Sequence, residues 1–183
     1  MRIFAALEPS PAFLEGLSGL QEILRSEGIE GQYQDVTNLH MTLAFIGEWQ
    51  EDVTDLLPLV TEPFHICLNH VGIFEKAKVL WAGVEESPQL EQLAASVRES
   101  LTRAQIPFDP KPFNPHITLI RKPHLPSGLS LQNLFVPEVS MTVREVCLYR
   151  SAREEHGMVY TVIGRKRADW DFGGDIENKT QEE

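Results

Sequence analysis

Cysteine is scarce in this sequence, and long apolar runs are missing. Its two cysteines, Cys67 and Cys147, are too few and too far apart for a disulfide scaffold or a zinc ribbon. We interpret them as small buried residues of a protein in the reducing cytoplasm. No run of 18 apolar residues occurs, which argues against a membrane-spanning helix. Glu8 interrupts the first apolar stretch too early for a secretion signal, so we expect none.

Basic residues are also few, 16 against 27 acidic ones, and the formal net charge is −11. Nonspecific binding to a polyanion needs rows of Lys and Arg, so this balance disfavours it. The charge is uneven, however: residues 111–167 carry nine bases and four acids. Residues 168–183 carry six acids and one lysine. We therefore predict one domain over residues 1–167, followed by a flexible acidic tail over residues 168–183.

The chain of 183 residues is 42% hydrophobic, which is enough to bury a sizeable core. Helices are predicted after Ser10-Pro11 and after Pro88, because each start combines a capping hydroxyl or proline with apolar residues at helical spacing. Short helices are predicted near residues 51–60 and 127–134. Apolar runs predict strands at residues 2–7, 38–46, 64–73, 78–84, 116–121, 138–149 and 157–165.

These predicted elements occur in the same order twice. A helix, a strand that contains histidine, a short helix and a two-strand hairpin recur with an offset of 76 residues between the histidines. An internal duplication is the simplest account, and two copies are too few for a solenoid. We therefore predict an α+β fold whose two halves place their histidine strands across a pseudo-twofold cleft.

The two histidine strands share the pattern His-x-Thr-Leu, as NLHMTL at residues 38–43 and NPHITL at residues 114–119. Residues i and i+2 of a strand point to one side, so His40 lies beside Thr42 and His116 beside Thr118. A single such pair is typical of a structural histidine. Two pairs at equivalent places favour a function, because burying both would cost stability.

Two facing imidazoles suit acid–base chemistry near neutral pH, since one accepts a proton while the other donates one. The hydroxyls of Thr42 and Thr118 are suitable donors to phosphate oxygens. Arg121 adds a guanidinium that fits phosphate, although a solvated arginine at a strand end is the alternative interpretation. The constellation predicts displacement at a phosphodiester without a metal.

Four segments resemble the bacterial and archaeal 2H phosphoesterases. They are RIFAAL at 2–7, NLHMTLAFIG at 38–47, VLWAGV at 79–84 and KPFNPHITLIRK at 111–122. Within that superfamily the chain is most similar to the RNA 2′,3′-cyclic phosphodiesterases, also called 2′-5′ RNA ligases. The resemblance covers about residues 1–165. It implies a bilobal fold of two pseudo-twofold-related lobes, each with an antiparallel sheet and helices, and both motifs lining the groove between them.

The resemblance implies that water opens a 2′,3′-cyclic phosphate to a 2′-phosphomonoester. His116 would be the general base on water, and His40 the general acid to the leaving O3′. Thr42, Thr118 and Arg121 would bind the phosphate. Phe45 matches an aromatic residue that stacks on the terminal base, although a core phenylalanine is the alternative interpretation.

The expected substrates are RNA 3′ termini or small cyclic phosphonucleotides, with no cofactor, no metal, no membrane and no obligate protein partner. The remaining histidines lack the spacing or the carboxylates of a metal site. No glycine-rich triphosphate loop is present, which disfavours an ATP-driven ligase. Two alternatives stay open: 2′-5′ ligation or hydrolysis of 2′-5′ linkages by the same four residues, and a noncatalytic module that binds RNA ends.

Overall fold

The computed structural model describes residues 1–168, so the predicted acidic tail, residues 168–183, lies outside the described residues except for Ala168, which is buried. Two helices and nine strands make up this part of the chain. The helices are α1 (Pro11–Ser26) and α2 (Pro88–Arg103). The strands are β1 (Arg2–Leu7), β2 (Glu30–Tyr33), β3 (Met41–Glu48), β4 (Phe64–Phe74), β5 (Val79–Val84), β6 (Ile117–His124), β7 (Ser140–Val143), β8 (Glu145–Glu154) and β9 (Gly157–Arg167).

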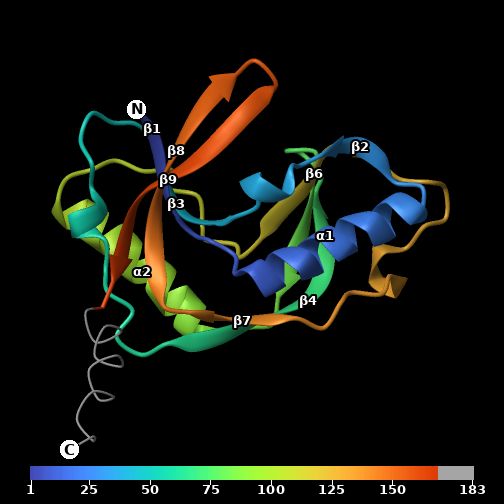
Figure 1. Ribbon diagram of the computed structural model, residues 1–183, viewed down its shortest axis with the longest axis horizontal. Helices are drawn as coiled ribbons and strands as arrows, with labels where there is room; N and C mark the ends of the chain where they lie inside the picture. The colour runs from blue at the N-terminus through green and yellow to red at the C-terminus, as the bar shows by residue number, and fades with distance from the viewer. Residues whose placement is uncertain (169–183) are drawn as a thin grey trace, which may run out of the picture.

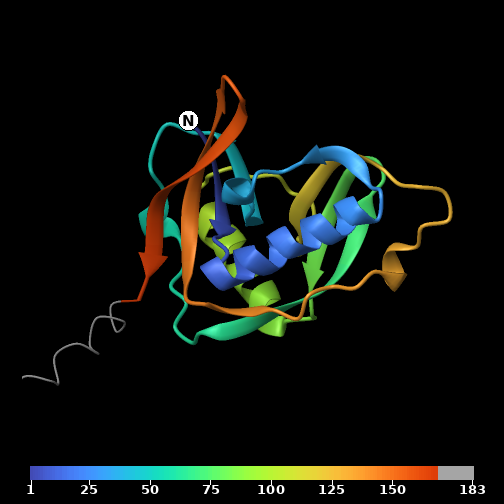
Figure 2. The same ribbon diagram turned by 45° about the vertical axis from the view of Figure 1, so that its right-hand side comes forward.

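The strands form two antiparallel sheets, which confirms the predicted bilobal α+β fold (Figures 1 and 2). One sheet has the strand order β3-β1-β8-β9, and the other has the order β2-β6-β5-β4-β7. Each sheet contains one motif strand, β3 or β6. The lobes are not contiguous halves of the chain. The hairpin β4–β5, which follows the first motif strand, pairs with the second, while β8–β9 joins the sheet of the first.

Both long helices begin as the sequence predicts. Ser10 caps α1 by accepting a hydrogen bond from the backbone N–H of Phe13, at 3.2 Å, and a proline occupies the first turn. Ser87 caps α2 in the same way through the N–H of Leu90, also at 3.2 Å. A capping hydroxyl followed by proline is a strong start signal, because it satisfies an otherwise free N–H and presets the first φ angle.

Each helix packs against a different sheet. In α1, the buried Gln21 amide donates to the backbone carbonyls of Gln34 and of Leu119 in β6, at 2.9 and 3.2 Å. In α2, the Arg98 guanidinium donates to the carbonyl of Leu43 in β3, at 3.2 Å. The helices therefore attach to the two motif strands, α1 to β6 and α2 to β3.

One hydrophobic core runs through both lobes. It includes the buried faces of α1 and α2 and the inner faces of both sheets. A second, small apolar cluster lies on the other face of the four-stranded sheet and consists of Phe4, Ala6, Cys147 and Tyr149. Because the lobes share one core, their relative position is set by buried packing.

Three predicted elements differ from the structure. The predicted strand at 138–149 is two strands, β7 and β8, which belong to different sheets and meet at Arg144. The predicted short helices near residues 51–60 and 127–134 are only 3₁₀ turns, at Thr54–Leu56 and Leu131–Asn133. Strand β2 was not predicted, because its sequence EGQY is polar and mostly exposed at a sheet edge. Neither helix is long and apolar enough to cross a membrane within the described part of the chain.

Candidate active site

The two motif histidines stand one residue before β3 and β6, rather than inside the strands as predicted. Each ring Nδ1 lies against a backbone carbonyl two residues earlier in the chain. The distance is 2.7 Å from His40 to Asn38 and 2.6 Å from His116 to Asn114. A carbonyl oxygen only accepts, so Nδ1 carries the hydrogen in both rings. The other nitrogen, Nε2, is therefore free for proton transfer in both histidines.

A β-bulge shapes the first motif strand. In the pairing of β1 with β3, Ala6 lies opposite Thr42 and Phe4 opposite Phe45, with a register shift at Leu43. Residues directly opposite each other share a face of the sheet, and Phe4 and Ala6 lie two positions apart. Thr42 and Phe45 therefore project from the same face, although three positions separate them.

The second motif strand has the same irregularity. In the pairing of β5 with β6, Trp81 lies opposite Thr118 and Val79 opposite Arg121, with the shift at Leu119. Arg121 therefore shares the face of Thr118. In a regular strand, a residue three positions away would point to the opposite side. Equivalent bulges thus turn Phe45 and Arg121, the predicted site residues that follow the two His-x-Thr pairs, to the same face as Thr42 and Thr118.

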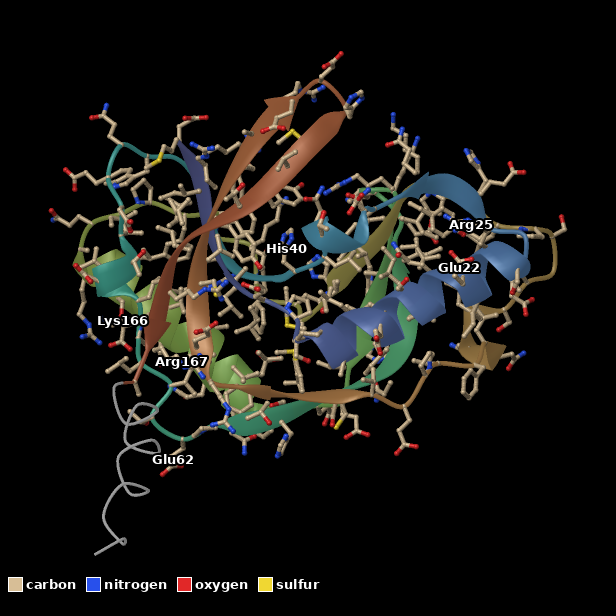
Figure 3. All side chains as sticks on the ribbon, in the orientation of Figure 1. Glu22, Arg25, His40, Glu62, Lys166 and Arg167 are labelled. Carbon is tan, nitrogen blue, oxygen red and sulfur yellow. The ribbon has the colours of Figure 1, made fainter. Side chains whose placement is uncertain are left out.

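His40 lies among aromatic rings near the middle of the molecule, between the β8–β9 hairpin and helix α1 (Figure 3). Its ring centroid is 4.7 Å from that of Phe4, 4.9 Å from that of Tyr160 and 5.6 Å from that of Tyr149. Three strands, β1, β8 and β9, supply these rings. They hold the imidazole plane by packing, while the bond to Asn38 fixes its tautomer.

This surrounding keeps His40 neutral. Burial lowers the pKa of His40 from 6.5 to about 4, and the hydrogen bond to the Asn38 carbonyl opposes that shift. The charge of Arg121, and that of His116 whenever His116 is protonated, lower the pKa of His40 further. The two histidines therefore lie within electrostatic reach of each other, as a pair of facing motifs requires.

His116 has a similar but less complete aromatic surrounding. Phe74 meets its ring edge to face at 4.9 Å between centroids, and Trp81 lies 6.3 Å away. Burial lowers the pKa of His116, the bond to the Asn114 carbonyl raises it, and the charge of Arg121 lowers it. Arg121 thus acts on both imidazoles, and it lines the larger cavity together with His40.

Two cavities meet between the lobes, and they share Thr42 and Phe45. The larger has a volume of about 1100 Å³ and contains His40 and Arg121 in its wall. The smaller, of about 300 Å³, contains His116 and Phe74. We call the two together the groove. Each histidine therefore lines one arm of the groove.

The remaining predicted residues are placed as follows. Thr118 is half-buried on the face of Trp81 and lines neither cavity. Phe45 is half-buried in the wall of both cavities, and the Arg2 guanidinium lies 4.9 Å above its ring. Phe45 is therefore a groove residue and does not belong to the main core.

Sequence reasoning missed Phe4, Tyr149 and Tyr160, the aromatic residues around His40. Their alternation along β1, β8 and β9 looks like ordinary strand packing, and only the register shows that they share a face. It also missed the Asn38 side chain, which donates to the Met158 carbonyl at 2.8 Å and accepts from the Tyr160 N–H at 3.2 Å. The recurrence of asparagine two residues before each histidine was the available signal.

Within residues 1–168, no three His, Cys, Asp or Glu side chains gather as metal ligands. Both cysteines are free thiols, Cys67 half-buried and Cys147 buried. Burial raises the pKa of the Cys147 thiol to about 12, so this residue packs as a neutral thiol in the cluster with Phe4 and Tyr149 and is a poor nucleophile.

A bilobal α+β fold in which each lobe presents one His-x-Thr strand to a shared groove defines a two-histidine phosphoesterase. The chain belongs to the 2′-5′ RNA ligase superfamily, whose family model matches residues 10–155.

Curated relatives match over nearly the whole chain. An RNA 2′,3′-cyclic phosphodiesterase of Archaeoglobus fulgidus is 31% identical over 172 residues, which cover 87% of this chain and 96% of the relative. Another of the same name from Thermotoga maritima is 25% identical, over 89% of this chain and 93% of the relative. Among solved structures, Escherichia coli LigT in apo form matches with a TM-score of 0.73 and 27% identity, over 90% and 95% of the two chains. A complex of LigT with 3′-AMP matches with a TM-score of 0.72 and 25% identity, over 92% and 98%.

Proposed function

We propose that this protein hydrolyses 2′,3′-cyclic phosphate termini of RNA to 2′-phosphomonoesters, by acid–base catalysis between His40 and His116. The observation that carries the proposal is the matched pair of imidazoles, each held through Nδ1 by a backbone carbonyl and each lining one arm of one groove. Relatives that span nearly the whole chain bear the name of this activity.

In the proposed reaction, Nε2 of His116 takes a proton from water as the water oxygen bonds to phosphorus. The bond from phosphorus to O3′ breaks, and O3′ takes a proton from Nε2 of His40. The product is a ribose with a 2′-phosphate and a free 3′-hydroxyl. His116 then holds one proton more and His40 one less, and exchange with solvent restores both.

The surrounding groups fit these roles. Thr42 supplies a hydroxyl donor from the wall of both cavities, Thr118 supplies one from the strand face that it shares with Arg121, and Arg121 supplies a positive charge for the phosphate oxygens. Because burial and Arg121 hold both imidazoles neutral in the free groove, the acid must gain its proton when the anion binds. A phosphate anion beside an imidazole raises the pKa of that ring, so substrate binding itself charges His40.

The reaction requires no metal in this proposal, because water is activated by an imidazole and the phosphate charge is met by arginine. We also place the protein in the cytoplasm, where two free thiols stay reduced.

The test is incubation of the purified protein with a trinucleotide that ends in a 2′,3′-cyclic phosphate, in EDTA, with an added 5′-hydroxyl oligonucleotide. We expect a 2′-phosphate product and full activity in the chelator. A 3′-phosphate product, or loss of turnover in EDTA, would contradict the proposal. A 2′-5′-linked product would indicate ligation at the same site, and binding without any product would indicate a noncatalytic module.

A further inference from the structure

The larger cavity extends well beyond the space that one cyclic phosphate occupies. Its volume of about 1100 Å³ lies just above the roughly 300–1,000 Å³ that is typical of small-molecule sites. From His40 it continues along β1 to the tip of the β8–β9 hairpin, which projects from the body of the molecule (Figures 1 and 2). His156 and Gly157 form the far wall at that tip.

Three exposed arginines from both lobes line this cavity: Arg2 on β1, Arg121 on β6 and Arg153 on β8. Arg2 lies opposite Ser151 in the sheet, two positions from Arg153, so these two are neighbours on the groove face. None of the three forms an ion pair with another residue of the described range. In a chain with a net charge of −11, a group of three arginines without carboxylate partners on one wall favours an anionic ligand.

The carboxylates in the same wall are already engaged. Asp35 accepts hydrogen bonds from the backbone N–H and the hydroxyl of Thr37, at 2.9 and 2.6 Å. Glu48 pairs with the amino group of Met1 at 3.5 Å. The wall therefore holds three guanidiniums and the Met1 amino group against two carboxylates, so its charge stays positive.

The smaller cavity has a different character. It also contains two cations, but the Arg98 guanidinium donates to the carbonyls of Leu43 and Lys111. The Lys111 ammonium lies 3.9 Å from the Asp109 carboxylate. Both cations are thus occupied, and this arm of about 300 Å³ faces His116, the proposed base. The smaller cavity therefore suits the entry of water and does not suit the binding of a polyanion.

We propose that the larger cavity binds single-stranded RNA over more than the terminal nucleotide, with Arg153 binding the phosphodiester on the 5′ side of the reacting cyclic phosphate. This inference rests on the proposed function, because the reacting phosphate is placed at His40 and Arg121. Phe45, stacked under Arg2, offers its ring to a base beside that phosphate. The enzyme therefore prefers oligonucleotide ends to mononucleotide 2′,3′-cyclic phosphates.

The experiment compares kcat/KM for a trinucleotide 2′,3′-cyclic phosphate and for the matching mononucleotide, in wild type, R153A and R150A. Arg150 is the matched control: it lies on the same strand and is exposed, but it pairs with Ile3 and does not line the cavity. We expect R153A to lower the trinucleotide-to-mononucleotide ratio about tenfold, the effect of one charge-assisted hydrogen bond. R150A should keep the wild-type ratio.

Salt dependence supplies a second measurement. Each phosphate contact on a single strand adds about 0.7 to the slope of log affinity against log salt, so R153A should reduce the slope of the trinucleotide by about that amount. Equal ratios in R153A and wild type, or equal losses in R153A and R150A, would overturn the inference. Failure of the wild type to turn over either substrate would instead overturn the proposed function.

Discussion

At the scale of single residues, the site depends on two imidazoles whose tautomer the backbone dictates. Asn38 and Asn114 each present a carbonyl to an Nδ1, so both free nitrogens are Nε2. The same environment lowers both pKa values, for His40 to about 4. The free enzyme therefore holds two neutral histidines, and its acid becomes charged only with the substrate.

This protonation state predicts different pH profiles for two kinetic constants. The profile of kcat/KM reports the free enzyme, so its bell should centre below pH 6.5, between the lowered pKa values of His40 and His116. The profile of kcat reports the bound complex, where the phosphate anion raises both pKa values, so its bell should lie at higher pH. Steady-state rates on a cyclic phosphate from pH 4 to 9 check this. Superimposable profiles would contradict it.

Phe45 provides a second test at this scale. Replacing it with Ala removes the ring that lines both cavities, and we expect kcat/KM on an RNA end to fall by about tenfold, since one base stack is worth roughly 1–3 kcal/mol. Phe45→Trp should retain activity because it keeps a stacking face. If the Ala variant is as active as the Trp variant, Phe45 does not contact the base.

At the scale of elements, the motif strands present their functional side chains to the groove because both strands are irregular. A bulge at Leu43 in β3 and another at Leu119 in β6 turn Phe45 and Arg121 toward the groove. The segment that precedes β3 is also held in place by hydrogen bonds from outside the motif. The Asn38 side chain bridges to the backbone of β9 at Met158 and Tyr160, so the second hairpin positions the first histidine.

This bridge predicts that Asn38→Ala lowers kcat while KM changes little, because the carbonyl that holds His40 loses its anchor on β9. Loss of two hydrogen bonds should also lower the free energy of unfolding by about 1–3 kcal/mol. Asn114→Ala is the matched control, since that side chain makes no hydrogen bond within residues 1–168. Steady-state kinetics and urea unfolding measure both effects. A loss of stability with unchanged kcat would show that Asn38 is purely structural.

At the scale of the whole molecule, the two lobes share one core, and each sheet contains a hairpin from the other half of the chain. The groove therefore folds as a unit with the domain. The protonation of His40, which is half-buried in this groove, is therefore linked to global stability. His40 binds fewer protons in the folded state than in the unfolded state between about pH 4 and 6.5, so acidification through that window destabilises the fold.

We accordingly expect the free energy of unfolding to fall as pH decreases from 6.5 to 4, and His40→Gln to fall less steeply than wild type. His124→Gln is the control, because His124 is exposed at the end of β6. Urea unfolding at several pH values tests this. Equal slopes in wild type and His40→Gln would contradict the lowered pKa.

Much of the fold and the motif pairs could be predicted from the sequence, because helix caps, apolar runs and a repeated His-x-Thr pattern are local signals. The bulges were not predictable, since a register shift depends on the partner strand. The division of residues 138–149 between two sheets was hidden in the same way, because both parts are apolar. The bond from Asn38 to β9 joins residues 120 positions apart, and no local pattern encodes it.

The most direct test of the central claim is turnover of a trinucleotide 2′,3′-cyclic phosphate by His40→Ala, His116→Ala and the double variant, with His124→Ala as control. The account predicts that each single variant loses about 10²–10⁴-fold in kcat and that the control keeps the wild-type rate. Because the two imidazoles act in one step, the double variant should be little worse than either single one. A double variant that retains wild-type turnover would contradict the account.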